Sequence, residues 1–377
     1  MGASGKMNIL VLTSSRADFG IYMPLLHELK TDESVNLKIL VFGTHLSKFH
    51  GYTITDIRNN DFEVDFTIST ILAGDESVDI STSYALTAQK FSDFWNLHQE
   101  DFDWVVALGD RFEMAAAVAA GIPFNLRFAH IHGGETTLGA IDNIYRHSIT
   151  LASKLHFVAH PEFKKRVCQI LNEEKCPCHV VGALSLDNIV KVRLLSTEEF
   201  EQKWAINLNM SSILVTLHPE TVSVAENEYF VNEAFKALGA LGRDTQLIIT
   251  MPNADTSGTM FRTMYQKLKD SSNLNIKLIE NFGTQSYFTC MKYSSLMIGN
   301  TSSGIIEAAS FGKFVINVGD RQKGRLSGEN VIDVHFESDA IIELANKYKE
   351  RIYDGPNVYF QNGAASKIVK KLKETNV

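Results

Sequence analysis

The chain has 377 residues, of which 45% are hydrophobic and 21% are charged, a globular composition that excludes an intrinsically disordered protein. The formal net charge of −8 argues against a general nucleic-acid surface, because phosphate binding favours a basic face. No apolar run approaches the ~18 residues of a membrane span, and the start of the chain lacks a secretory signal, so we expect neither nucleic acid nor a membrane as partner. Four cysteines are too few for a disulfide scaffold of this size, which makes the cytoplasm the expected location.

Apolar segments typical of strands alternate with amphipathic segments typical of helices along the whole chain. In the first half, the expected strands are 8–13, 37–42, 62–68, 104–108, 128–131 and 156–159, and the expected helices are 21–30, 81–98, 111–120, 142–153 and one that Pro161 opens. In the second half, the expected strands are 213–216, 247–250, 296–298 and 314–318, and the expected helices are 226–241, 259–268, 304–311 and 363–373. Two such series predict two doubly wound, Rossmann-like α/β domains, at 7–185 and 186–360, with a final helix in 361–377.

Ionisable residues gather in the loops that follow two neighbouring strands of the first half. They are Asp110 and Arg111 after strand 104–108, and His132, Glu135, Asp142 and Arg146 after strand 128–131. Ligands bind at the carboxyl ends of the strands of an open parallel sheet, and clustered ionisable groups there can be tuned for proton transfer. Structural alternatives stay open, since Asp110 could only cap a helix and Arg146 could lie on a solvated helix face.

A small, hydroxyl-rich loop in the second half predicts an anion site. Thr301, Ser302, Ser303 and Gly304 stand between a strand and a helix, where backbone N–H groups and the helix dipole favour negative charge. The alternative is an ordinary helix cap with a turn glycine. Glu307 follows in the same helix and could accept hydrogen bonds from ribose hydroxyls.

Further polar residues follow other strands of the second half and favour a nucleotide-diphosphate site. They are His218, Asn253 and Arg321, of which the arginine suits a phosphate. In the first half, Arg16 follows the first strand and could reach a phosphate, or could form a surface salt bridge.

Several motifs of other enzyme classes are missing. The first loop is not G-x-G-x-x-G, which argues against a dehydrogenase, and no G-x-x-x-x-G-K-[ST] occurs, which argues against a P-loop kinase. The run Cys176-Pro177-Cys178-His179 could be half of a zinc site, but no second pair of ligands has matching spacing. We therefore expect neither a metal nor a cofactor.

Taken in order along the chain, short motifs resemble the UDP-N-acetylglucosamine 2-epimerases, and most of all the hydrolysing branch that opens the sialic-acid and legionaminic-acid pathways. These motifs are Ser15-Arg16-Ala17-Asp18, Gly109-Asp110-Arg111, Gly133-Gly134-Glu135, Ile141-Asp142, Arg146-His147, His218-Pro219, Asn300-Thr301-Ser302-Ser303-Gly304 and Arg321-Gln322. The resemblance runs from about Met7 to the C-terminal region.

That resemblance implies a GT-B fold of two facing domains, with the final helix returning to the first. It implies UDP on the second domain and the sugar against the first, where Asp110 and Asp142 match acidic groups assigned to catalysis. Many members of the family carry a glutamate where this chain has His132. Histidine also exchanges a proton near neutrality, so His132 can act as the acid/base in place of that glutamate. Alternatively, Glu135 can act as the acid/base.

The reaction implied is conversion of UDP-N-acetylglucosamine to N-acetylmannosamine and UDP through a 2-acetamidoglucal. A competing substrate is UDP-2,4-diacetamido-2,4,6-trideoxyglucose. A non-hydrolysing epimerase, a GT-B glycosyltransferase and a non-catalytic nucleotide-sugar sensor remain as alternatives. The family also suggests a homodimer or homotetramer.

Overall fold

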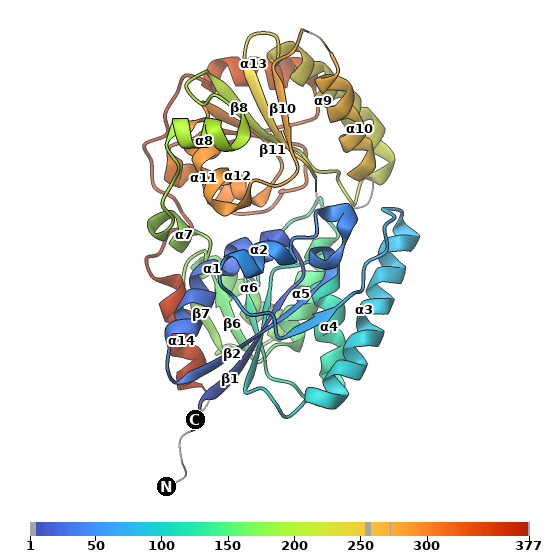
Figure 1. The fold of residues 1–377 in the computed structure, drawn as a ribbon, viewed down its shortest axis with the longest axis vertical. Coiled ribbons are helices and arrows are strands. Elements are labelled where there is room, and N and C mark those ends of the chain that lie inside the picture. Colours follow the sequence, from blue (N-terminus) through green and yellow to red (C-terminus); the bar gives the residue numbers. More distant parts are fainter. Residues whose placement is uncertain (1–4, 253–257, 272, 376–377) are drawn as a thin grey trace. The chain divides into compact units, whose positions relative to one another are not determined.

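A computed structural model describes residues 5–252, 258–271 and 273–375 of the chain (Figure 1). The chain folds as two compact α/β units. Unit 1 comprises Met1–Glu135, Asp142–Lys191 and Tyr359–Val377, and unit 2 comprises Thr136–Ile141 and Val192–Val358. The division differs from the expected domains, since 186–191 belong to unit 1 and Thr136–Ile141, which we expected in the N-terminal domain, belong to unit 2.

Strands and helices alternate through unit 1. In chain order they are β1 (Met7–Thr13), α1 (Arg16–Thr31), β2 (Val35–Phe42), α2 (Ile54–Asn59), β3 (Phe66–Ile68), α3 (Ser77–His98), β4 (Trp104–Leu108), α4 (Phe112–Gly121), β5 (Phe128–Ile131), α5 (Asp142–Ala152), β6 (Leu155–Val158), α6 (Pro161–Leu171), β7 (Cys178–Val180), α7 (Leu186–Lys191) and α14 (Ala364–Glu374). Within the described residues, the strands form one parallel sheet in the order β3-β2-β1-β4-β5-β6-β7.

The sheet of unit 1 is covered by helices on both faces, because successive side chains of a buried parallel strand point to opposite faces. Ile9 and Val11 of β1 pack in the cluster that holds the apolar faces of α1 and α14. Leu10 and Leu12 pack in the other cluster, with the aromatic side chains of α3 and the alanines of α4. This explains why β1 reads as a continuous apolar run instead of an alternating one.

Unit 2 repeats the plan with fewer strands. Its elements are α8 (Thr197–Trp204), β8 (Ser212–Thr216), α9 (Asn227–Leu241), β9 (Gln246–Thr250), α10 (Gly258–Lys269), β10 (Ile276–Ile279), α11 (Gly283–Tyr293), β11 (Leu296–Gly299), α12 (Ser302–Ile306), β12 (Val315–Val318), β13 (Val331–Val334) and α13 (Ser338–Tyr348). The described strands form a parallel sheet in the order β10-β9-β8-β11-β12-β13. Core clusters again line both faces.

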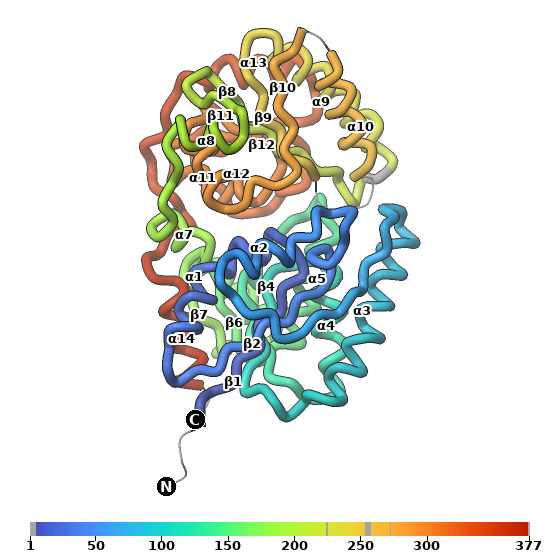
Figure 2. Tube along the Cα trace, viewed as in Figure 1, coloured from blue at the N-terminus to red at the C-terminus, as the bar shows by residue number. Residues whose placement is uncertain are grey.

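The final helix α14 packs beside α1 within unit 1, although the two are more than 300 residues apart in the sequence (Figure 2). Both carboxylate oxygens of the buried Asp187 accept hydrogen bonds from its first N–H groups, those of Ala364 at 3.2 Å and Ala365 at 2.8 Å. At the other end, the Trp104 indole N–H donates to the Leu372 carbonyl at 3.2 Å. A carboxylate at a helix N-terminus satisfies unpaired donors and complements the helix dipole. Asp187 and Trp104 therefore attach α14 to the rest of unit 1 at its first and last turns.

The cysteines differ from expectation. Cys168 at the end of α6 and Cys176 before β7 form a disulfide, with Cα atoms 5.3 Å apart, which the low cysteine count did not predict. Burial raises the pKa of the Cys178 and Cys290 thiols to about 12. Among the described residues, no group of three His, Cys, Asp or Glu side chains is placed to hold a metal ion.

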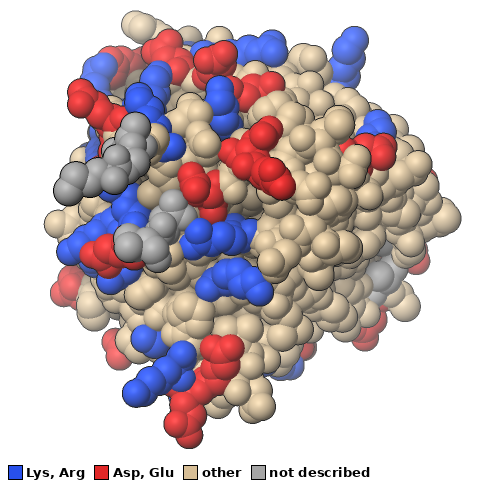
Figure 3. All heavy atoms as spheres, turned by 90° about the horizontal axis from the view of Figure 1, so that it is seen from below, with Lys and Arg blue, Asp and Glu red and all other residues tan. Residues whose placement is uncertain are grey.

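Charged side chains of both signs stand next to one another on the face displayed in Figure 3. Ion pairs of this kind include Lys373 with Asp32 at 2.8 Å and Lys371 with Glu374 at 2.6 Å. Exposed pairs contribute about 0–1 kcal/mol each, so each unit is stabilised mainly by its own hydrophobic core clusters and not by these surface pairs. In the described part of the chain, every helix is too short or too polar to cross a membrane.

Three buried histidines link the stability of unit 1 to pH. Burial lowers the pKa of His45 and His156 to about 4 and that of His130 to about 3. The unfolded chain binds these protons near pH 6.5, so unfolding takes up protons between pH 6.5 and about 4. The stabilisation is therefore complete above pH 6.5 and is lost as the pH falls through that window.

We expect His156→Phe to flatten the pH dependence of the free energy of unfolding by about 1 kcal/mol per pH unit between about pH 6 and about pH 4.5, because one fewer proton is taken up. Urea unfolding at four pH values measures this slope. The exposed His335 supplies the control, since His335→Gln should leave the slope as it is. An equal slope in His156→Phe and the parent chain would contradict the assignment.

Candidate functional site

The strand order of unit 1 reverses between β1 and β4, and the loops after these strands carry the first group of predicted site residues. Ligands of open α/β sheets bind at such a reversal, outside the carboxyl ends of the strands. Arg16 is the first residue of α1, after β1, and Asp110 and Arg111 follow β4. The topology thus brings residues almost a hundred positions apart to one edge of the sheet.

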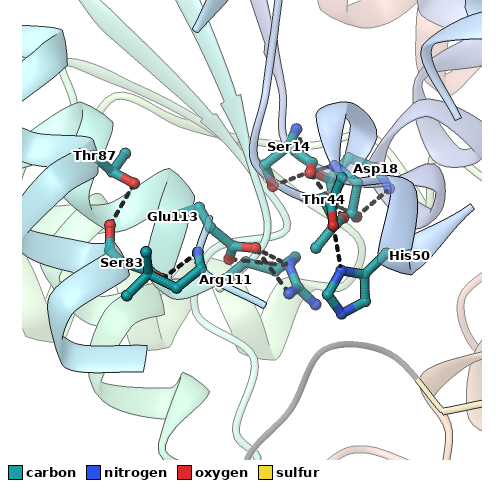
Figure 4. Close-up of polar contacts among 11 residues, drawn as sticks. Ser14, Asp18, Thr44, His50, Ser83, Thr87, Arg111 and Glu113 are labelled. Atoms are coloured by element: carbon teal, nitrogen blue, oxygen red, sulfur yellow. Dashed lines mark hydrogen bonds and ion pairs between the residues drawn. The ribbon is translucent and has the colours of Figure 1, made fainter. Parts of the chain in front are cut away.

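Asp18 shapes the loop after β1. Its carboxylate accepts from the N–H and hydroxyl of Ser14 at 2.9 and 2.7 Å, and from those of Ser15 at 3.1 and 2.7 Å (Figure 4). Ser15 in turn caps α1, which completes a capping box. Four bonds to one buried carboxylate fix the backbone from which Arg16 projects.

Arg111 is held by an unusual partner. Glu113 is fully buried in the first turn of α4, and its carboxylate accepts from the Arg111 guanidinium at 2.9 and 3.1 Å (Figure 4). Burial raises the pKa of Glu113, and the neighbouring Arg111 opposes that rise. A buried carboxylate needs such a partner, and the two bonds between Glu113 and Arg111 fix the orientation of the Arg111 guanidinium.

Buried Arg146 connects two other predicted residues, Asp110 and Glu135. Its guanidinium forms an ion pair with the carboxylate of Asp110 and donates to the main-chain carbonyl of Glu135 at 2.9 Å. Only 1% of Arg146 is exposed, so the alternative of a solvated helix face is wrong. Asp142 begins the same helix α5, one turn before Arg146.

His132 and Glu135 form a buried pair in the loop after β5. Nδ1 of His132 lies 2.7 Å from Oε1 of Glu135, which is fully buried. A carboxylate accepts here, so the Nδ1–H of His132 is the donor and Nε2 is the remaining ring nitrogen. Nε2 is buried and has no hydrogen-bond partner in the described structure. His132 has a φ of +65°, a region that non-glycine residues rarely adopt and that often marks functional sites.

His130 and His147 lie near this network but differ from His132. Both ring nitrogens of His130 are engaged, Nε2 with the Gly109 carbonyl at 2.9 Å and Nδ1 with the Thr150 hydroxyl at 3.1 Å. His130 is therefore a buried, hydrogen-bonded residue. Burial also lowers the pKa of His147 to about 4.

In unit 2 the strand order reverses between β8 and β11, and one side chain connects the two strand ends. The Asn300 amide accepts from the His218 N–H at 2.7 Å and donates to the His218 carbonyl at 2.9 Å. Asn300 is fully buried, and its own carbonyl accepts from the Gln322 amide at 3.0 Å. This bidentate bond sets the main chain of the predicted nucleotide loops.

The hydroxyl-rich loop lies at the start of α12 as the pattern predicts. Thr301 occupies the N-cap position, and its hydroxyl lies 3.5 Å from the Ser303 N–H. The Ser303 hydroxyl lies 2.6 Å from that of Tyr287 on α11, a residue that the sequence did not single out. Burial raises the pKa of Tyr287 to about 12, so it stays a neutral phenol. Glu307 is buried at the end of this short helix.

The loop after β12 carries Arg321 and is fixed by Glu220. The Glu220 carboxylate accepts from the Asp320 N–H at 2.6 Å, and burial raises its pKa. Gly319, with a φ of +79°, packs against the same carboxylate and leaves no room for a side chain. Arg321 is half-buried, and Asn253, the remaining predicted residue, lies outside the described residues.

Each unit therefore carries its own group of predicted residues in the loops and first helical turns that follow its strands. Unit 1 holds Arg16, Asp110, Arg111, His132, Glu135, Asp142 and Arg146, and unit 2 holds His218, Thr301, Ser302, Ser303, Gly304, Glu307 and Arg321. Sequence reasoning missed His45 and Tyr287. His45 bridges the hydroxyls of Thr13 and Thr53 at 2.9 and 2.7 Å, and no local pattern marks such a contact.

Two doubly wound α/β units with such edges define a GT-B-like fold, and solved structures share it. A crystal structure of UDP-GlcNAc 2-epimerase from Neisseria meningitidis bound to UDP-GlcNAc has a TM-score of 0.80 and 20% identity, covering 98% of this chain and 100% of that one. The UDP-GlcNAc 2-epimerase of Methanocaldococcus jannaschii, in complex with UDP-GlcNAc and UDP, has a TM-score of 0.78 and 16% identity, with 98% and 100% covered. At these identities the likeness establishes the fold.

The sequence pattern described as UDP-N-acetylglucosamine 2-epimerase matches residues 27–373, and the chain belongs to that family. The GDP/UDP-N,N'-diacetylbacillosamine 2-epimerase (hydrolyzing) of Campylobacter jejuni is 35% identical over 99% of this chain and 97% of its own. The UDP-N,N'-diacetylbacillosamine 2-epimerase (hydrolyzing) of Legionella pneumophila is 33% identical, over 90% and 89%. The similarity confirms the resemblance to the hydrolysing branch.

Asn300→Ala should destabilise unit 2, because it removes both bonds to His218 and leaves a buried N–H and a buried carbonyl unpaired. We expect the free energy of unfolding to fall by about 2–4 kcal/mol, measured by urea unfolding. Asn209→Ala is the matched control, since Asn209 is exposed and should change stability by less than about 0.5 kcal/mol. Equal stability of the two variants would show that the bidentate bond does not support these loops.

Proposed function

We propose that the protein is a hydrolysing 2-epimerase that acts on a nucleotide-linked 2-acetamido sugar and releases UDP together with the free 2-epimer. Membership of the family supports the reaction class. The single structural observation that carries the proposal is the joined network of Asp110, Arg146, Glu135 and His132, which holds acidic and basic groups at one sheet edge.

The chemistry proceeds in two stages. In the first, a base removes the C2 proton, the C2–H electron pair forms the C1–C2 double bond, and the C1–O bond breaks with its electrons leaving on UDP. In the second, water adds to C1 of the 2-acetamidoglucal, and C2 receives a proton on the opposite face. Proton transfer of this kind needs a carboxylate or an imidazole near each face of the ring.

Asp110 and Asp142 are the proposed acid/base pair at C2. Arg146 orients Asp110 through their ion pair. His132 is held by Glu135 and orients water or shares the proton through Nε2, which has no hydrogen-bond partner among the described residues. Because the histidine donates Nδ1–H to a buried carboxylate, an imidazolium formed at Nε2 would be stabilised by charge. The histidine at this position is therefore compatible with the acid/base role of the glutamate found in other members.

The leaving diphosphate gains negative charge as the C1–O bond breaks, so fixed donors lower the barrier. We assign this role to the start of α12, with Thr301, Ser302, Ser303 and Gly304, and to Arg321. His218, Asn253 and Glu307 complete the proposed nucleotide site of unit 2, while Arg16 and Arg111 are the cationic groups that unit 1 offers to a phosphate. No metal and no cofactor is part of this proposal.

Two sugars remain as substrates. UDP-N-acetylglucosamine follows from the sequence resemblance, and a relative described as UDP-N-acetylglucosamine 2-epimerase from Neisseria meningitidis is 28% identical, over 89% of this chain and 85% of its own. The Campylobacter and Legionella relatives favour UDP-N,N'-diacetylbacillosamine, a 2,4-diacetamido-2,4,6-trideoxy sugar. The description of the Campylobacter relative names GDP as well as UDP, so the identity of the nucleobase, guanine or uracil, is also to be tested. Use in sialic-type acid synthesis, a cytoplasmic location and a homo-oligomer stay part of the proposal.

Incubation of the protein with each nucleotide sugar in D₂O, without an acceptor, tests the reaction by proton NMR. We expect free UDP and a free 2-epimer that carries deuterium at C2, because the C2 proton is exchanged with solvent during the reaction. A product that stays linked to UDP would indicate a non-hydrolysing epimerase. Unchanged sugars that nevertheless bind would indicate a sensor or a transferase awaiting its acceptor.

Asp110→Asn should lower sugar release by about 10²–10⁴-fold, because the amide cannot exchange the proton. UDP binding, measured by calorimetry, should persist, since the nucleotide site is assigned to unit 2. Asp244→Asn is the matched control on an exposed turn and should keep normal turnover. Near-normal turnover in Asp110→Asn would refute its catalytic role.

A further inference from the structure

We propose that Thr136–Ile141, here called the strap, is a positioning segment that couples diphosphate binding in unit 2 to the placement of the acid/base residues in unit 1. The inference rests on the proposed function. Its basis is the course of the chain, which leaves unit 1 after Glu135, joins unit 2 for the strap, and returns to unit 1 at Asp142.

Main-chain contacts dock the strap on unit 2. The Leu138 N–H donates to the Lys323 carbonyl at 2.9 Å, and the Ile141 N–H donates to the Thr221 hydroxyl at 3.0 Å. Leu138 remains 54% exposed, so burial of its apolar side chain does not explain the docking. Two main-chain N–H groups of the strap therefore take part in its docking.

Two glycines allow this close approach. A Cβ on Gly139 would clash with the backbone of Asp320 and Arg321, which cannot move aside as a flexible side chain would. A Cβ on Gly324 would lie 3.0 Å from the Thr136 methyl group. The strap and the loop 319–325 thus fit each other only because these positions lack side chains.

The loop that receives the strap is the one that carries Arg321. Asp320 and Lys323, which contact the strap, stand on either side of this proposed diphosphate ligand. Glu220 fixes the same loop through the Asp320 N–H. A diphosphate that orders Arg321 must therefore also order the backbone to which the strap is bonded.

Both ends of the strap enter the acid/base network. Glu135 precedes it and contacts His132 with its carboxylate and Arg146 with its carbonyl. Asp142 follows it and starts α5, the helix that carries Arg146 to Asp110. A shift of the strap would move the main chain of both flanking residues. An error of about 1 Å in such placements costs about 10²-fold in rate.

The experiment compares Gly139→Ala with Gly239→Ala. Gly239 lies in α9, and a Cβ there meets only the Leu268 side chain at an ordinary 3.8 Å, so it is a matched control. We expect Gly139→Ala to lower kcat by about 10²-fold while the Kd for UDP changes by less than about threefold. Gly239→Ala should match the parent chain in both.

Amide hydrogen exchange of the strap provides a second measurement. If the strap had only a structural role, UDP binding would not change its exchange rates. UDP should slow exchange of the Leu138 and Ile141 amides in the parent chain and in Gly239→Ala, but not in Gly139→Ala. If Gly139→Ala does not fold, Thr221→Val decides: it removes only the acceptor of the Ile141 N–H and should lower kcat about 2- to 10-fold at unchanged UDP affinity.

The outcomes separate the two proposals. A parent chain that neither binds UDP nor releases the sugar would overturn the proposed function. A parent chain that does both, with Gly139→Ala or Thr221→Val turning over at its rate, would overturn the positioning role of the strap alone. UDP protection of the strap that persists in Gly139→Ala would also contradict the coupling.

Discussion

The buried guanidinium of Arg146 is the constraint on which the proposed acid/base group of unit 1 depends. A charge that is 1% exposed is costly unless its hydrogen bonds are satisfied, and Asp110 and the Glu135 carbonyl supply partners from two different strand ends. Glu135 in turn orients His132. One buried cation thereby joins the loops after β4 and β5 and the helix α5 into a single arrangement of ionisable groups.

In unit 2, amide side chains and one carboxylate connect the corresponding strand ends and loops. Asn300 joins the ends of β8 and β11, and Gln322 and Glu220 attach the loop after β12. These bonds restrain the main chain of the loops that carry the start of α12 and Arg321. Fixed donors suit a leaving group that gains charge, since little reorganisation is then required during the reaction.

Local patterns predicted much of the fold. The buried strands β1, β4, β8 and β12 read as apolar runs, and the α/β class of both halves is confirmed. The short strands β10 and β13 were missed, because four residues carry too little periodicity. The Cys168–Cys176 disulfide was missed because the pairing depends on how α6 meets β7.

The sequence by itself determined the family, the two-series α/β plan and the residue types available for proton transfer and anion binding, because motifs and periodicity are local properties of the chain. Only the tertiary structure decided which of these residues meet. It made Arg146 a buried partner of Asp110 instead of a solvated residue, and paired His132 with Glu135. It also assigned Thr136–Ile141 to the second unit, since strand order and loop docking arise from contacts between distant segments.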